Sequence, residues 1–226
     1  MTDRELLRLH IEAVWGISIP TLDGAGVELT DTTPLPPWSL YQTTLAQGEQ
    51  ITIWRPGVAS DERADFLQRA RIAGSAFDPA VGMRREIVLR FRDTPTLAAQ
   101  PSARLLTADD TALLEAFEAG SAAYYLNLAC APCIGVIANG RLVTVAHSSR
   151  RTAAACELGI NTLPEARHQG YAAAATRAWT HAIQQEALTP IYSAFAHNTA
   201  SLRLAAAAGY VQVSASVYGP VSETYE

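Results

Sequence analysis

The sequence predicts an α+β fold in which hairpin-connected strands and one crossover build a mixed sheet flanked by helices. Two β-rich runs are joined by Asn139-Gly140, which is the strongest short-range signal of a hairpin. An alanine-rich helical segment at 170–186 lies between two further strand-like runs, as a crossover helix does. A smaller α/β region precedes this part of the chain.

The N-terminal α/β region is expected at residues 1–95, without an assigned role. Its expected elements are a helix at 3–14, strands near 26–30 and at 50–55, a helix at 60–73 and a strand at 85–91. Two proline-rich stretches interrupt the chain, TPLPPW (33–38) and DTPTLAAQPSA (93–103), and the second is typical of a linker. We therefore expect a second domain at 102–226.

The second domain shows a regular alternation of strand and helix signals. ARLLT (103–107) predicts a strand, and DDTALLEAFEAG predicts a helix that starts on acidic residues and ends at Gly120. The elements expected after it are the hairpin at 133–149, a strand at 155–163, the helix at 170–186, a strand at 190–197, a helix at 198–209 and a strand at 210–219. This order combines hairpins with a single βαβ crossover.

Composition excludes several classes of function. The chain has 226 residues, a formal net charge of -5 and 49% hydrophobic residues, enough for a sizeable core. Lysine and arginine form no block, so we expect no nucleic-acid partner, although a local site can still bind an anion. The charged N-terminus differs from a secretory signal, and no apolar run approaches the ~18 residues of a membrane span. We expect a cytoplasmic protein without a membrane partner.

Cysteine is scarce and occurs as Cys130, Cys133 and Cys156. The first two have C-x-x-C spacing, which is found in redox pairs and in halves of metal sites. A zinc site would need two more ligands, and a redox pair usually opens a helix, whereas an apolar strand follows here. We expect buried, structural cysteines and no metal.

The start of the helix near Gly170 lacks an ordinary cap. A helix leaves about four main-chain N–H groups without partners, and Ser, Thr, Asp or Asn usually caps them. Here the residues are Arg167, His168, Gln169 and Gly170. One interpretation is that Glu165 reaches back to cap the helix. The other is that an anionic ligand accepts hydrogen bonds from the free amides. In that case Arg167 adds a charge-assisted contact, and Gly170 allows the main chain to approach the anion closely.

The preceding strand favours a particular anion. A ligand that lies along a splayed strand end can pair with main-chain groups of Ile160, Asn161 and Thr162 while its phosphates reach the helix. Pantetheine supplies such amides, and coenzyme A adds the pyrophosphate.

The segment LPEARHQGYA resembles the acyl-CoA-binding motif of the GNAT (Gcn5-related) N-acetyltransferase superfamily, in which Arg/Gln-x-x-Gly-x-Gly/Ala opens the helix. The later HNTASLRLAAAAGY is similar to a second family segment, with Asn198, Ser201 and Gly209-Tyr210 in the usual places. The resemblance covers about 102–219 and implies a GNAT-type mixed, mostly antiparallel sheet that binds acetyl-CoA. The residues expected at the cofactor are Ile160, Asn161, Thr162, Arg167, His168, Gln169, Gly170, Tyr171, Ala172, Asn198 and Ser201.

The resemblance also implies a reaction, the direct transfer of an acetyl group from the thioester to a primary amine. Glu157 lies where many members place a catalytic carboxylate, and His147 on the neighbouring strand is a second candidate for the base. The tyrosine that many members use as the acid corresponds to Ala205, so Tyr192, Tyr210, Tyr218 or water is left for that role.

The partner predicted by the reaction is a small-molecule or peptide amine. The sequence leaves the oligomeric state open, and a homodimer is one of the states compatible with it. The alternative that stays open is a catalytically silent module that binds coenzyme A or acyl-CoA as a sensor, for which the alanine at 205 is the best support. A nucleotide-binding α/β protein is disfavoured because the sequence has neither a Gly-x-Gly-x-x-Gly nor a P-loop pattern.

Overall fold

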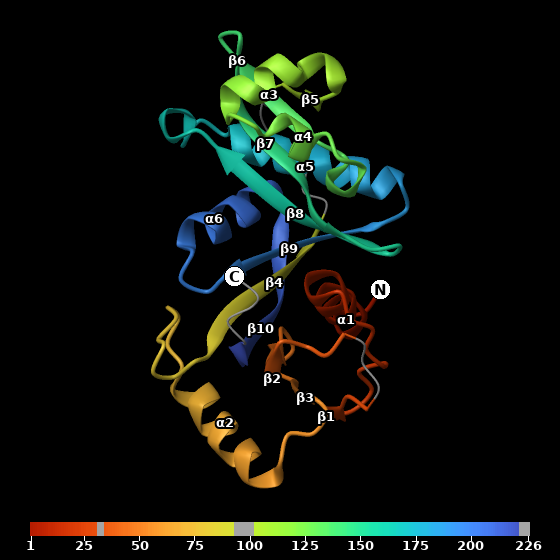
Figure 1. Cartoon of the computed structure of the whole chain (residues 1–226), viewed down its shortest axis with the longest axis vertical. Coiled ribbons are helices and arrows are strands. Elements are labelled where there is room, and N and C mark those ends of the chain that lie inside the picture. Colours follow the sequence, from red (N-terminus) through yellow and green to blue (C-terminus); the bar gives the residue numbers. More distant parts are fainter. Residues whose placement is uncertain (31–33, 93–101, 222–226) are drawn as a thin grey trace. The chain divides into compact units, whose positions relative to one another are not determined.

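The computed structural model describes residues 1–30, 34–92 and 102–221 (Figure 1). These residues form two compact units. The first unit comprises residues up to 90, 193–202 and 212–221, and the second comprises 91–92, 102–192 and 203–211. Some elements therefore begin in one unit and end in the other.

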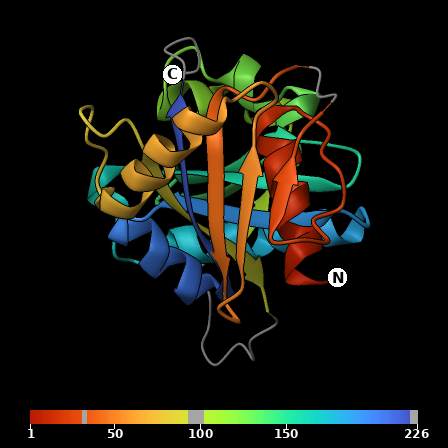
Figure 2. The ribbon, with the colours of Figure 1, turned by 90° about the horizontal axis from the view of Figure 1, so that it is seen from below.

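The first unit is built on a sheet with the strand order β1-β3-β2-β10-β4. Its elements are α1 (Asp3–Trp15), β1 (Gly26–Glu28), β2 (Trp38–Leu45), β3 (Gln50–Trp54), α2 (Ser60–Ile72), most of β4 (Arg84–Phe91) and the greater part of β10 (Tyr210–Val221). Strands β2 and β3 form an antiparallel hairpin, seen in orange in Figure 2. Strand β10 joins β2 antiparallel, with Tyr218 opposite Tyr41, so a C-terminal strand completes an otherwise N-terminal sheet.

Local chemistry explains the helix α1. Thr2 caps it by accepting a hydrogen bond from the Glu5 amide, and the Glu5 carboxylate accepts one from the Thr2 amide, which makes a capping box. The helix ends at Gly16, which has the left-handed conformation that glycine adopts without strain. Its buried face carries Leu6 and Ile11, both fully buried.

The second unit is a sheet with the order β9-β8-β7-β6-β5 and helices on both faces. Its elements are β5 (Ala103–Leu105), η1 (Ala108–Asp110), α3 (Thr111–Phe117), α4 (Ala122–Tyr125), η2 (Leu128–Cys130), β6 (Ile134–Ala138), β7 (Arg141–Arg151), β8 (Ala155–Thr162), η3 (Pro164–Ala166), α5 (Tyr171–Gln185) and parts of β9 (Thr189–Phe195) and α6 (Thr199–Ala208). Strands β5 to β8 are antiparallel neighbours, and β8 and β9 are parallel.

Two adjacent residues of β7 show which helices cover which face. Ser148 receives a hydrogen bond from the Trp179 indole of α5, whereas His147 contacts Tyr124 of α4. Because successive side chains of a strand point to opposite faces, α5 covers one face of this sheet and α4 the other (Figure 1).

The predicted fold class is confirmed as a mixed α+β architecture with a large, mostly antiparallel sheet flanked by helices. The hairpin, α5 and the strands around them lie within a few residues of their predicted bounds. Strand β2 and the short helix α4 were not predicted. The predicted linker at 93–103 lies almost entirely outside the described residues. The predicted division of the chain into an N-terminal region (1–95) and a second domain (102–226) stays a prediction. Among the described residues, no helix has the length and apolar character needed to cross a membrane.

Candidate active site

Strand β8 parts from its neighbour β9 halfway along its length. The parallel pairing runs from Ala155 opposite Thr189 to Glu157 opposite Ile191 and goes no further. Strand β8 continues to Thr162. Its last five residues therefore have an edge that β9 does not pair with.

The hydrogen bonds on either side of β8 show which main-chain groups lie on that edge. The Thr189 amide of β9 donates to the Ala154 carbonyl (2.9 Å), whereas the Leu163 amide donates to the Val143 carbonyl beside β7 (3.0 Å). Main-chain groups alternate in direction along a strand, so even-numbered residues of β8 face the β9 side. The amide and carbonyl of Ile160 therefore lie on the open edge.

The next two residues follow the same alternation. Thr162 also presents its main chain to the open edge, and its hydroxyl accepts a hydrogen bond from Thr144 (3.1 Å). Asn161 turns its main chain toward β7, and its side-chain amide donates to the Tyr125 hydroxyl (2.8 Å). Of the three residues predicted to pair with the ligand through their main chain, Ile160 and Thr162 therefore have the suitable direction and Asn161 does not.

Helix α5 begins without a side-chain cap. Gly170 occupies the cap position, and the first helical bond runs from the Ala174 amide to the Gly170 carbonyl (3.0 Å). Within the part of the chain that the structure describes, the amides from Gln169 to Ala173 find no acceptor. An uncapped helix start of this kind is a ready-made site for an anion.

Glu165 does not serve as the cap. Its carboxylate receives a hydrogen bond from Arg141 (3.4 Å), and its carbonyl receives one from the Gln169 side chain (3.3 Å). The self-capping alternative is therefore not what the structure shows. Arg167 and His168 are exposed beside the uncapped amides.

The backbone before α5 has an unusual conformation. His168 and Gly170 both have positive φ, 63° and 80°. A Cβ added to Gly170 would meet no atom within 4 Å, so glycine is required here by the conformation rather than by crowding. Tyr171 and Ala172, the first residues of the helix, are half-buried.

Glu157, the predicted base, is buried in the face that α4 covers. Its side chain is 4% exposed, and its Oε2 atom receives a hydrogen bond from Arg150 (2.8 Å). The pair arises where a bulge in β7 shifts the register and brings Arg150 opposite Glu157. The carboxylate is thus held in place by a cation that the sequence pattern did not indicate.

His147, the second candidate, is also buried on this face. Its Nε2 lies 3.1 Å from the Tyr124 hydroxyl, and its ring makes edge contacts with Tyr124 and Tyr125. Its Nδ1 is buried and finds no hydrogen-bonding partner among the described residues. Burial lowers the pKa of His147 to about 4, so the imidazole is neutral at pH 7. Directly opposite lies Gly159, which leaves room for the ring.

The tyrosines considered for the acid role lie mostly in the core. The hydroxyl of Tyr210 is 2.7 Å from that of Thr180, and burial raises the pKa of Tyr210. Tyr192 packs edge-on against it, and Tyr218 stacks on Tyr41 in the first unit. Tyr124, which the sequence did not single out, is half-exposed beside His147, and desolvation raises its pKa.

The segment after β9 contributes two further predicted residues. The Asn198 side chain accepts a hydrogen bond from the Ser201 amide (3.1 Å), which caps the start of α6. Both belong to the first unit, whereas the other predicted cofactor residues belong to the second.

Comparison with known proteins relates the C-terminal half of the chain to one family. The profile described as GNAT acetyltransferase matches residues 111–217, and this match supports GNAT superfamily membership. No curated protein sequence matches the chain.

A solved structure supports the fold. The chain is similar to a GNAT-family acetyltransferase from Colwellia psychrerythraea at a TM-score of 0.52 and 16% identity, with 79% of this chain and 63% of that chain covered. It is also similar to a GNAT-family protein from Novosphingobium aromaticivorans at a TM-score of 0.47 and 20% identity, covering 60% and 63%. The match thus spans 63% of the length of each of these two proteins.

Proposed function

We propose that this protein is an acetyl-CoA-dependent N-acetyltransferase that acts on a primary amine. One observation supports this most strongly: an uncapped helix start follows directly after a strand whose outer edge is unpaired. The strand edge offers hydrogen bonds to the amides of pantetheine, and the free main-chain amides at the helix start can donate hydrogen bonds to the oxygens of a diphosphate. Both features occur at the residues where the family motif falls.

The cofactor is held by two groups of residues in this proposal. Main-chain groups of Ile160 and Thr162 bind the pantetheine arm. The amides from Gln169 to Ala173 bind the pyrophosphate, and Arg167 adds a charge-assisted contact. His168 shapes the loop through its left-handed backbone. When bound, acetyl-CoA supplies the thioester carbonyl that the amine attacks and the thiolate that leaves.

The protein's own groups would then act on protons and charge. Glu157 takes the proton that the attacking amine loses, either directly or through one water. Ile160, through its main-chain amide, donates a hydrogen bond to the carbonyl oxygen as negative charge develops there. His147 is neutral at pH 7, because burial lowers its pKa to about 4, and in this proposal it orients the groups beside it through its contacts with Tyr124 and Tyr125.

A second function, a silent CoA-binding module, is favoured by two observations. Ala205, at the position of the family's acid, is fully buried, and Glu157 is engaged by Arg150. Such a protein would bind the cofactor through the same residues without turnover.

The cofactor half of the proposal is tested by two matched glycine variants. Gly140 resembles Gly170 closely: its φ is 75°, and an added Cβ would meet nothing within 4 Å. Both valine variants therefore carry a similar backbone strain, about 1–2 kcal/mol. Calorimetry with CoA should show normal binding by Gly140→Val and binding weakened at least about tenfold by Gly170→Val. Equal affinities would refute the placement of the pyrophosphate.

The catalytic half is tested by thiol release. Acetyl-CoA is mixed with a panel of primary amines, and free thiol is followed over time. Release that depends on an amine supports the transferase. Tight binding of acetyl-CoA with no release on any amine favours the silent module. A cytoplasmic location, a homodimer and the domain bounds 1–95 and 102–226 remain parts of this proposal.

A further inference from the structure

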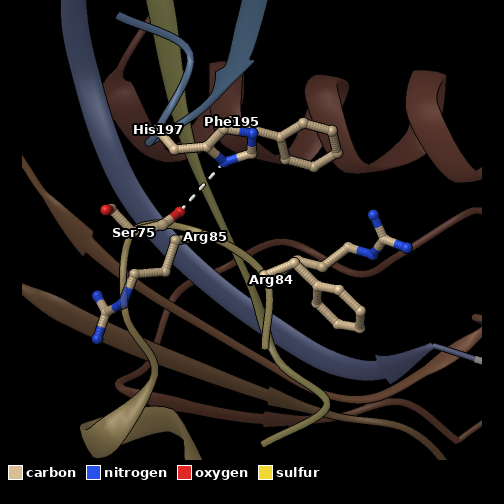
Figure 3. A pocket seen from close by; sticks show the side chains of 6 residues that line it. Ser75, Arg84, Arg85, Phe195 and His197 are labelled. Carbon is tan, nitrogen blue, oxygen red and sulfur yellow. Dashed lines mark hydrogen bonds between the residues drawn. The ribbon is translucent and has the colours of Figure 1, made fainter. Parts of the chain in front are cut away.

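A small pocket in the first unit has no room for an organic ligand. Its lining residues are Ser75, Phe77, Arg84, Arg85, Phe195 and His197 (Figure 3). The enclosed space is about 10 Å³, which holds one water at most. Nδ1 of His197 donates to the Ser75 carbonyl (3.3 Å) and so ties the α2–β4 loop to the end of β9. This pocket is therefore a packing feature, whereas the second unit places reactive groups beside the open edge of β8.

Tyr124 of α4 lies beside the point where β8 parts from β9. Gly159 of β8 is opposite His147, and a Cβ added to Gly159 would lie 2.6 Å from Nε2 of the imidazole. The ring therefore lies directly over the main chain of Gly159, one residue before Ile160. The Tyr124 hydroxyl is 3.1 Å from the same Nε2. Two successive contacts thus place this hydroxyl close to the start of the open edge.

Tyr124 is also accessible, unlike the tyrosines that the sequence offered for the acid role. It is 52% exposed, whereas Tyr192, Tyr210 and Tyr218 are 2–3% exposed. A ligand that lies along the edge of β8 can therefore reach Tyr124 without any rearrangement of the core.

The imidazole of His147 sets the direction of the Tyr124 hydroxyl. Its Nδ1 is buried and has no hydrogen-bonding partner in the part of the chain that the structure describes. An unpaired N–H is the rarer defect in a protein interior, so we place the proton of the neutral imidazole on Nε2. Nε2 then donates to the Tyr124 oxygen, and the Tyr124 O–H points its proton toward another acceptor.

The surroundings of Tyr124 keep it protonated at neutral pH. Desolvation raises its pKa most, and the neighbouring Cys130 and Tyr125 raise it further. Arg150 acts on this pKa in the opposite direction, because a cation stabilises a tyrosinate. The proton therefore stays on Tyr124 until negative charge develops beside it, and Arg150 and the Nε2–H of His147 then stabilise the oxygen that has lost it.

We propose that Tyr124 contacts the sulfur of the bound thioester cofactor and gives it a proton as the C–S bond breaks. This inference rests on the proposed transferase function. In that function the pyrophosphate lies at the start of α5, after Thr162, and the pantetheine arm lies along the edge of β8. The arm therefore runs past Ile160 toward Gly159, and its sulfur end comes to lie beside Tyr124.

The step balances without a further reactant. The amine nitrogen bonds to the carbonyl carbon and loses its proton to Glu157, while the C–S bond breaks and the sulfur takes the proton of Tyr124. Water then carries the proton from Glu157 to the tyrosinate, which restores both groups. The products are the amide and the free thiol.

The contact is tested by the ionisation of CoA bound to the full chain, followed through the ultraviolet absorbance of the thiolate. The same titration with desulfo-CoA, which lacks the sulfur, subtracts the protein's own tyrosines and cysteines. Tyr124→Phe removes a hydrogen bond to a charged group, so the pKa of the bound thiol should rise by about 1–2. The matched control is Tyr125→Phe, whose hydroxyl accepts a hydrogen bond from Asn161 (2.8 Å), and it should leave the pKa of the thiol unchanged.

Turnover supplies the second readout. Tyr124→Phe keeps the ring against His147, so the variant should unfold at the same temperature as the unmutated protein and bind acetyl-CoA equally well. Its kcat for thiol release should fall by about 100-fold. The unmutated protein should lose activity at alkaline pH as Tyr124 ionises, and this loss should be absent from the pH–rate profile of Tyr124→Phe.

Two results would overturn the proposal. One is a thiol pKa that is the same in Tyr124→Phe and in the unmutated protein, and the other is a kcat that Tyr124→Phe and Tyr125→Phe lower equally. If the unmutated protein released no thiol with any amine, the transferase function and the proton transfer would both be refuted. The thiol titration would then decide by itself whether Tyr124 contacts the sulfur.

Discussion

The contact between Gly159 and His147 allows a quantitative prediction. A Cβ at Gly159 would lie 2.3 Å from Cε1 and 2.6 Å from Nε2 of His147. Ordinary carbon contacts are about 3.5–4.0 Å, so the ring would have to move by more than about 1 Å. His147 is 5% exposed and is held between Tyr124 and Tyr125. Overpacking costs about 1–3 kcal/mol and the lost hydrogen bond about 0.5–1.5 kcal/mol.

Gly159→Ala should therefore destabilise the protein by roughly 2–4 kcal/mol. Urea unfolding followed by circular dichroism and tryptophan fluorescence measures this, because Trp179 is fully buried in the same unit. A double-mutant cycle supplies the control: in a His147→Ala background, where the obstructing ring is gone, Gly159→Ala should cost less than about 1 kcal/mol. A penalty that persists in that background would show that crowding against the imidazole is not its origin.

Three further predictions concern ionisable groups. Glu157→Gln should lower kcat and change the affinity for acetyl-CoA little, and an unaltered pH–rate profile would exclude Glu157 as the base. Burial lowers the pKa of His147 to about 4, so below about pH 6.5 the unfolded chain binds more protons at this residue than the folded protein does. The unmutated protein should therefore lose roughly 2–3 kcal/mol of its free energy of unfolding between pH 6.5 and pH 4. Urea titrations should show a flatter pH dependence for His147→Gln, and an identical slope would contradict a buried neutral histidine. Asp110 has a pKa lowered to about 2, first by the Arg104 hydrogen bond and then by the Thr107 amide. The stability that Asp110 contributes is complete above about pH 4 and is lost as the pH falls toward 2. Asp110→Asn should remove this pH dependence of the free energy of unfolding, and a dependence that persists in the variant would argue against the Arg104–Asp110 pair as its origin.

Local patterns in the sequence accounted for much of the second unit. The Asn139-Gly140 pair predicted the hairpin, and both residues have the positive φ, 51° and 75°, that a tight two-residue turn requires. The periodic alanine-rich run predicted α5, and the lack of a capping residue before it corresponds to the uncapped amides. Signals of this kind depend only on neighbouring residues, so they can be read without knowledge of the fold.

Three features were not predicted from the sequence: strand β2, the contact between Arg150 and Glu157, and the position of Tyr124. Strand β2 directly follows a proline-rich run, and its pairing with β10 joins residues far apart in sequence. Arg150 reaches Glu157 only because a bulge shifts the register of β7. Tyr124 lies on a helix of four residues, too short for a periodic signal, although its adjacent aromatic pair was a visible cue.

The most direct measurement is the response of individual main-chain amides to CoA, recorded by nuclear magnetic resonance on the full chain labelled with nitrogen-15. The account predicts the largest shift changes at the amides from Gln169 to Ala173, together with Ile160 and Thr162 on the strand edge. Pantetheine, which lacks the diphosphate, should shift the strand amides and leave those at the helix start in place. Saturation with CoA that left the amides of Gln169 to Ala173 unchanged would contradict the account.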